Sequence, residues 1–181
     1  MAAQGVQKVI SLDGIKLSPE LIWLHLQDLV AETDAHLHFV RQLSQDQINL
    51  PFIVTHCSAG RLHLSCCVPM EDGKRLREIL RSENSFGRRF HLVGSVGLIS
   101  MFPHRSNLPL LYVLIDVLRA ASLTVYGFAS SISSLTFVTD YAELDTAVAA
   151  IKQHVDLPRG FVPLRPEFRI RQRPLAPGSC R

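Results

Sequence analysis

The sequence is poor in the residues on which cross-linked and redox-active proteins depend. Among its 181 residues there are only four cysteines, and two of them, Cys66 and Cys67, are adjacent. No Cys-x-x-Cys pair occurs and no basic residue flanks these thiols, so a disulfide framework and a redox centre are both disfavoured. Reduced thiols fit the cytosol. Cys66 also shares the apolar alternation of Leu62 and Leu64, which predicts a place in the core.

Charge and long apolar runs are scarce as well. Charged residues make up 19% of the chain, the net charge is +3, and the excess arginine gathers near the C-terminus. This charge is too small and too local to indicate a nucleic-acid-binding face. No apolar run approaches the roughly 18 residues of a membrane span, and residues 1–8 lack the charged and apolar regions of a secretion signal. We therefore expect a cytoplasmic protein.

The motifs of catalysis and cofactor binding are missing too. The sequence has no phosphate-binding loop, no carboxylate pair at a catalytic spacing and no nucleophile elbow. His25, His63 and Cys67 share one parity on expected strands, which makes a metal site conceivable. Histidine on an open sheet face is, however, usually a surface residue. We predict no catalytic residues, no cofactor and no metal.

What the sequence does contain is a repeated order of strands and helices. Apolar residues make up 47% of the chain, which is ample for a buried core. Apolar periodicity predicts a strand, a helix, the two strands of a hairpin and a second helix, in that order, over residues 21–30, 35–43, 51–58, 61–68 and 71–82.

The same order returns from residue 96, at a shift of about 73 residues. A strand at 96–102 leads into a helix at 108–121 that carries Pro109 in its first turn. A second hairpin and a helix with an Asp140-x-x-Glu143 capping box follow. Segments 90–95 and 167–172 can each supply a last strand, and the sequence leaves open which copy each one closes.

These patterns predict an α+β protein made of two tandem ferredoxin-like βαββαβ units, with antiparallel sheets and helices on one face. The expected first domain covers residues 6–95 and includes a lead-in strand or hairpin at 6–17. The expected second domain covers residues 96–173, and residues 174–181 are expected to form a flexible tail.

The second copy resembles a known protein family. Its strand from Val96 to Ser100, its Arg105-Ser106 elbow and its Ser-rich turn before Leu135 are similar to parts of the second ACT domain in the regulatory tail of aspartokinases. Residues 6–82 resemble the first ACT domain more loosely, with Ile48-Asn49 similar to the Ile-Asn that starts its second strand. No nucleotide-binding kinase domain precedes the pair, so the resemblance implies a regulatory module that stands alone.

The resemblance implies that a small amino acid, such as lysine or threonine in aspartokinases, binds at an interface between ACT-like units. The contacts would come from the loop after the first strand, the start of the first helix and the start of the second strand. The implied ligand-binding residues are Asp34, Ala35, Asn49, Leu50 and Phe52 in the first copy, and His104, Arg105, Ser106, Asn107, Leu108, Thr124, Val125 and Tyr126 in the second.

The elbow at 104–107 admits two interpretations. The free amides of a helix N-terminus, with Arg105 beside them, can accept the carboxylate of an amino acid. Alternatively, Ser106 or Asn107 caps the helix and Arg105 stays solvated, which needs no ligand. The family elbow normally carries Pro-Gly, whereas this chain has Asp34-Ala35 in one copy and Pro109-Leu110 in the other.

Three functional hypotheses follow. The first is a non-catalytic regulatory module that binds an amino acid and transmits its occupancy to a partner protein. The second is a structural or dimerisation module without a ligand. The third is a small enzyme on a ferredoxin-like scaffold, for which the sequence offers no group of catalytic residues. Exposed edge strands predict a homodimer in either of the first two cases.

Overall fold

The computed structural model describes residues 10–30, 35–82, 89–103 and 108–165. They form two compact units. The inserted unit lies within residues 20–96, and the flanking unit combines residues 10–19 with residues 97–165. The chain therefore starts the flanking unit, builds the inserted unit and then returns to complete the flanking one.

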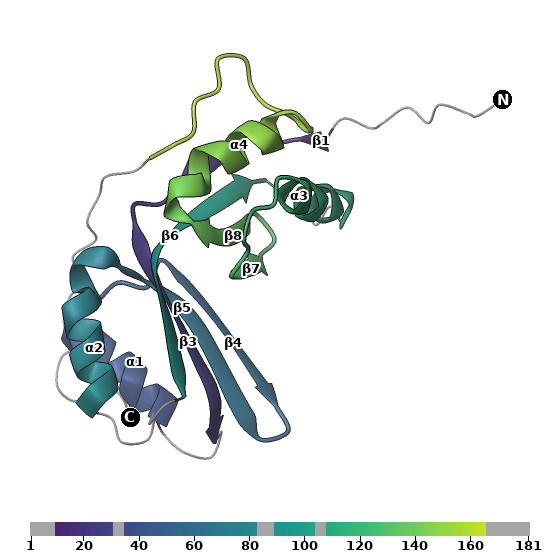
Figure 1. Ribbon diagram of the computed structural model, residues 1–181. Coiled ribbons are helices and arrows are strands. Elements are labelled where there is room, and N and C mark those ends of the chain that lie inside the picture. Colours follow the sequence, from purple (N-terminus) through teal and green to yellow (C-terminus); the bar gives the residue numbers. More distant parts are fainter. Residues whose placement is uncertain (1–9, 31–34, 83–88, 104–107, 166–181) are drawn as a thin grey trace. The chain divides into compact units, whose positions relative to one another are not determined.

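The inserted unit has the predicted order of elements. Its strands are β3 (Leu21–Val30), β4 (Phe52–Ser58), β5 (Arg61–Pro69) and the first part of β6 (Phe90–Phe102). All pairings are antiparallel, in the order β4-β5-β3-β6. The helices α1 (Ala35–Gln45) and α2 (Gly73–Ser82), the latter preceded by the 3-10 turn η1 (Met70–Asp72), lie on one side of this sheet (Figure 1). Segment 90–95 thus supplies the last strand of this unit.

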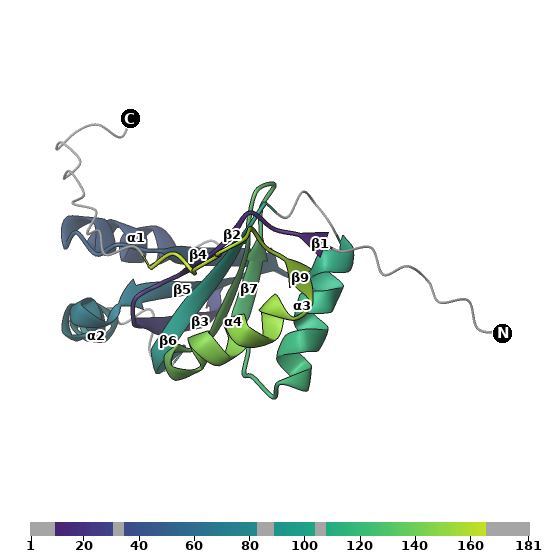
Figure 2. The same ribbon diagram turned by 90° about the horizontal axis from the view of Figure 1, so that it is seen from above.

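The flanking unit repeats the arrangement with the second part of β6. It adds β2 (Gly14–Leu17), α3 (Leu108–Ala120), β7 (Gly127–Ser130), β8 (Leu135–Asp140), the 3-10 turn η2 (Tyr141–Glu143) and α4 (Leu144–Lys152). The strand order is β7-β8-β6, with β2 antiparallel to β6. The short strands β1 (Ile10–Ser11) and β9 (Val155–Asp156) pair in parallel (Figure 2).

Two features differ from the sequence-based domain boundaries. Residues 14–17 pair with residues 99–102 of β6 and so belong to the flanking unit rather than to the first copy. Their fully buried side chains, Ile15 and Leu17, belong to the apolar core of the flanking unit. The two strands expected at 90–95 and 96–102 are one strand, β6, because Gly94-Ser95 forms an irregularity against β3 and not a turn. Segment 167–172 and the expected tail lie outside the described residues.

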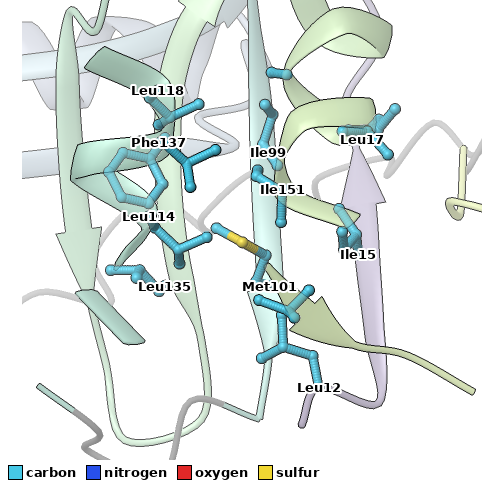
Figure 3. Packing of buried hydrophobic residues seen from close by; sticks show 14 of the residues in the cluster. Leu12, Ile15, Leu17, Ile99, Met101, Leu114, Leu118, Leu135, Phe137 and Ile151 are labelled. Atoms are coloured by element: carbon cyan, nitrogen blue, oxygen red, sulfur yellow. The ribbon is translucent and has the colours of Figure 1, made fainter. Parts of the chain in front are cut away.

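Each unit has its own apolar core between sheet and helices. In the flanking unit, side chains of β2, β6 and β8 pack against α3 and α4 around Met101 and Phe137 (Figure 3). In the inserted unit, Leu24, Phe39 and Cys66 belong to the corresponding cluster. Burial alternates only in the middle of the two predicted strands, where His25 and Ser65 are less buried than their neighbours, whereas residues 21–24 and 66–68 are buried throughout. None of the helices in the described ranges is long and apolar enough to span a membrane.

Each unit contains the same kind of packing contact, but the large and the small residue have exchanged places. The contact joins the helix-facing side of the first strand to the first residue of the second helix. In the inserted unit it is made by Ile22 on β3 and Gly73 on α2, and in the flanking unit by Gly97 on β6 and Leu144 on α4. A Cβ atom at Gly73 would lie 2.5 Å from Ile22 Cδ1, and one at Gly97 would lie 2.7 Å from Leu144 Cδ1. Each glycine therefore leaves room for the large side chain opposite it, which would have to move if the glycine carried a Cβ atom.

Candidate functional site

The candidate segment at the start of β7 is held firmly to β8. Tyr126 N donates a hydrogen bond to Val138 O at 2.9 Å, and the buried hydroxyl of Thr139 donates to Thr124 O at 2.6 Å. The Tyr126 hydroxyl donates to Asp140 Oδ1 at 2.8 Å. This bond, followed by burial, raises the pKa of Tyr126, so the hydroxyl stays protonated at neutral pH. These hydrogen bonds therefore fix the conformation of residues 124–126.

The other part of the flanking-unit candidate lies at the start of α3. His104, Arg105, Ser106 and Asn107 lie outside the described residues, and the helix begins at Leu108, which is 74% exposed. The side chains of Thr124 and Val125 are exposed as well, while Tyr126 is half-buried. Leu108, Thr124 and Val125 are thus the exposed side chains among the described residues of this set.

In the inserted unit the candidate residues are more deeply packed. Asp34 lies outside the described residues, and Ala35 is the first residue of α1. Phe52 is 6% exposed and its ring lies 5.8 Å from the ring of Trp23, centroid to centroid. Leu50 packs against the core, and Asn49 is half-buried. Phe52 and Leu50 are therefore packing residues, and Asn49 is the polar candidate that remains here.

The described ends of the candidate segments lie far apart within each unit. In the inserted unit, Phe52 is paired with Cys67, which is level with Trp23 near the start of β3, whereas Ser58 is paired with Arg61, which is level with the end of β3. The end of β3 and the start of β4 are thus separated by the length of β4, about 20 Å.

The flanking unit separates the start of α3 from Thr124 in the same way. The α3 helix spans about 20 Å, with Leu108 at its start. Hydrogen bonds from Ser122 N to Arg119 O and from Leu123 N to Leu118 O hold the chain before Thr124 at the other end. Within the flanking unit, Leu108 and Thr124 therefore lie at opposite ends of α3.

The cysteines and histidines follow the parities expected from the sequence. Register places His25 opposite Ser65 and Trp23 opposite Cys67, so His25, His63 and Cys67 share one face of the sheet. Burial raises the pKa of Cys66 to about 12 and that of Cys67 further still, so both thiols are unreactive at neutral pH. Within the described parts of the chain, no group of three or more His, Cys, Asp or Glu side chains is placed to hold a metal ion.

Solved structures match this arrangement of elements closely, although no protein-family model and no curated protein matches the sequence. The ligand-free regulatory subunit of aspartate kinase from Thermus thermophilus is 12% identical, with a TM-score of 0.69 over 81% of this chain and 99% of that chain. The chain has the fold of an aspartokinase regulatory subunit. The resemblance seen in the sequence, and with it the ferredoxin-like ACT fold class, is confirmed at the level of the fold.

Two other matches support the same fold. The regulatory subunit of aspartate kinase from Thermus flavus is 13% identical, with a TM-score of 0.70 over 80% of this chain and 98% of that chain. Aspartokinase III of E. coli in complex with lysine and aspartate is 10% identical, with a TM-score of 0.62 over 83% of this chain but only 34% of the enzyme. The fold therefore matches whole regulatory subunits and about a third of a full aspartokinase.

Proposed function

We propose that this chain is a non-catalytic regulatory module that binds a small amino acid between ACT-like units. The observation that carries the proposal is the match of the fold to regulatory subunits of aspartate kinase over nearly their whole length. One of the matched enzymes was crystallised with lysine and aspartate. Amino acids are accordingly the first ligands to test.

The separation of the candidate segments supports a site that two units share. From one unit, the segment from Thr124 to Tyr126 would contribute the exposed side chain of Thr124 to the site. The elbow of another unit would contribute helix N-terminal amides, and Arg105 in the flanking unit would add its guanidinium group, to hold the ligand carboxylate. Ligand binding then stabilises whichever arrangement of the units forms the complete site, which is the thermodynamic requirement for regulation.

A second copy of the chain is the partner that the surface favours. Each unit exposes an apolar pair on its first helix, Leu37 and Val40 on α1 and Tyr112 and Ile115 on α3. The inward-facing residues of the same helices are Phe39 with Leu43 and Leu114 with Leu118, so the two exposed pairs occupy equivalent places in the repeat.

Among the described strands, β4 and β7 lie at the two ends of the strand order, and each adds a further apolar side chain. Ile53 on β4 is paired with the core residue Cys66, and Phe128 on β7 is paired with the core residue Phe137, so both point to the helix side of their sheet. Both are nevertheless exposed. Unpaired strand edges flanked by apolar side chains are typical of surfaces covered by association. We propose a homodimer built on at least one of these edges.

An alternative function is a dimerisation module without a ligand. It is favoured by the absence of the Pro-Gly elbow of the family, because glycine lets a backbone approach a ligand closely. The exposed apolar pairs on α1 and α3 are required by this alternative as well, so ligand binding decides between the two functions.

A thermal-shift screen against the twenty amino acids tests ligand binding. We expect one amino acid or a few chemically similar ones to raise the melting temperature with increasing dose. At a concentration of 100 times the dissociation constant, the ligand should add about 2.7 kcal/mol to the free energy of unfolding. Arg105→Ala should abolish the shift. Arg119→Ala is the matched control, because Arg119 pairs with Asp116 on the exposed face of α3. No shift at millimolar concentration would favour the module without a ligand.

Sedimentation of aspartate variants tests the assembly. Val40→Asp and Ile115→Asp each place a charge where an apolar side chain would be buried in a dimer. Burial of such a side chain contributes about 1.5–3 kcal/mol, so its loss should weaken association about tenfold or more. Ile132→Asp is the matched control, because Ile132 is 87% exposed in the loop between β7 and β8, away from the apolar pairs. If neither helix variant changes the sedimentation of the protein, these helices are not the interface.

A further inference from the structure

Four histidines lie side by side on one face of the sheet of the inserted unit, one on each strand. His56 on β4 is directly opposite His63 on β5, and His25 on β3 is directly opposite His91 on β6. His25 is also opposite Ser65, the next residue of β5 on the same face as His63. We call His25, His56, His63 and His91 the histidine row.

The row lies on the face of the sheet that α1 and α2 do not cover. On β3, Leu24 and Leu26 point to the helices and belong to the core of the inserted unit. His25, which alternates with them, points to the other side. Its ring is half-buried, whereas His56 and His91 are exposed. Water and protons therefore reach the row directly.

The contacts within the row are close enough for the imidazoles to influence one another. The rings of His56 and His63 are stacked, with centroids 4.8 Å apart and planes 12° apart. His25 Nδ1 lies 2.7 Å from Ser65 Oγ. Side chains directly opposite on neighbouring strands have Cβ atoms only about 5 Å apart, which places His91 within the same range of His25.

Negative charge to balance protonated imidazoles is scarce on this face. The four strands contain one carboxylate in their sequence, Asp28, whose side chain lies outside the described part of the structure. By alternation, Arg61 of β5 follows the parity of His63, and Arg89, at the start of β6, follows that of His91. The Cys67 thiol shares the face but burial raises its pKa, so it stays neutral. Each proton taken up therefore adds a positive charge beside others of the same sign.

The pKa of His25 reflects these neighbouring charges. The pKa of His25 is lowered from its ordinary value of 6.5, first by burial and then by the charges of His63 and His91. A histidine with a lowered pKa in the folded state binds fewer protons than in the unfolded state. The stability that it contributes is complete above about pH 6.5 and is lost as the pH falls below that value toward the lowered pKa.

We propose that the histidine row is an acid-sensitive device that weakens the inserted unit as its imidazoles take up protons. Protonation of His25 places a charge in a half-buried site beside His63 and His91. The device needs no amino acid ligand. It therefore operates whether or not the proposed regulatory function is correct, and both can be tested on the same ligand-free protein.

Histidine-selective NMR of the full chain between pH 8 and 5 tests the row directly. We expect His25 to titrate below 6.5, and both His91→Gln and His63→Gln to move its midpoint upward, because each removes a neighbouring charge. Raising the salt concentration should have the same effect on the midpoint, since salt screens partly exposed charges. A His25 midpoint at or above 6.5 would overturn the proposal.

Urea unfolding at pH 7.5 and pH 5.5 tests the consequence for stability. For each unit by which folding lowers a pKa, the unfolding equilibrium constant changes about tenfold. The free energy of unfolding of the wild type should therefore be smaller at pH 5.5 than at pH 7.5. His25→Gln should remove much of that difference. His91→Gln provides a milder test because its ring is exposed. His154→Gln, outside the row and at the end of α4, should keep the full pH dependence. An equal pH dependence in the wild type and in both row variants would refute the device.

Discussion

Replacing Phe137 by alanine is expected to destabilise the flanking unit by about 3–5 kcal/mol. Phe137 lies on β8, is 1% exposed and packs beside Leu114 and Leu118 in the cluster drawn in Figure 3. It is among the largest fully buried side chains of the described chain. Alanine removes the transfer free energy of the ring and leaves a cavity that neighbours such as Leu114 and Leu118 fill only in part.

Phe128 offers a matched control for this substitution. It is the residue directly opposite Phe137, and the two rings lie 6.0 Å apart, centroid to centroid. Phe128 is exposed, so Phe128→Ala should cost no more than about 1 kcal/mol, the value of an aromatic pair on a sheet. If both variants lose equal stability, the core is not organised around Phe137.

The position of tryptophan makes the measurement specific to a unit. The chain has one tryptophan, Trp23, and it belongs to the inserted unit. Urea unfolding followed by circular dichroism reports on both units, whereas Trp23 fluorescence reports on the inserted one. Phe137→Ala should therefore shift the circular-dichroism transition to lower urea. A shift confined to the fluorescence would contradict the placement of Phe137 in the flanking core.

The repeated order of elements was predictable because each element is encoded locally. The patterns at 21–30 and 61–68 depend on neighbours within one strand. The capping box predicted at 140–143 was wrong in its contacts: α4 begins at Leu144, neither Asp140 nor Glu143 makes a side-chain capping hydrogen bond, and the Asp140 carboxylate accepts from Tyr126 instead.

The buried face of α1 is harder to read from the sequence. Leu37, Val40 and Leu43 recur at helical spacing with Phe39 beside them, but the buried residues are Phe39 and Leu43. Apolar residues on both sides of one helix permit more than one stripe, and only packing selects between them.

The partner of the N-terminal segment could not be predicted for a physical reason. Residues 14–17 pair with residues 99–102, which lie on the far side of the whole inserted unit in the sequence. A strand of four residues carries too little pattern to identify so distant a neighbour. The same limit applies to the candidate site. The start of α3 and Thr124 lie at opposite ends of that helix, and no local motif around Asn49 or Thr124 indicates such a distance.

A large residue at position 97 and a glycine at position 144 are each expected to lower the free energy of unfolding strongly, and the two losses are expected to cancel in part when combined. Gly97→Ile alone forces a branched side chain against Leu144, where even a Cβ atom would lie 2.7 Å from Leu144 Cδ1, and should cost at least about 1–3 kcal/mol. Leu144→Gly alone should cost about 3–5 kcal/mol, because it leaves a cavity and adds a glycine at the start of α4.

The double variant Gly97→Ile with Leu144→Gly recreates in the flanking unit the pairing of Ile22 with Gly73 found in the inserted unit. Because the added isoleucine occupies the space of the deleted leucine, the double variant should be more stable than the sum of the single effects by about 1–3 kcal/mol. Urea unfolding of the four proteins gives this coupling. As a control, Gly94→Ala has open space around its Cβ position and should not couple to Leu144→Gly. Additive effects of Gly97→Ile and Leu144→Gly would mean that the two units do not use one contact with reversed sizes.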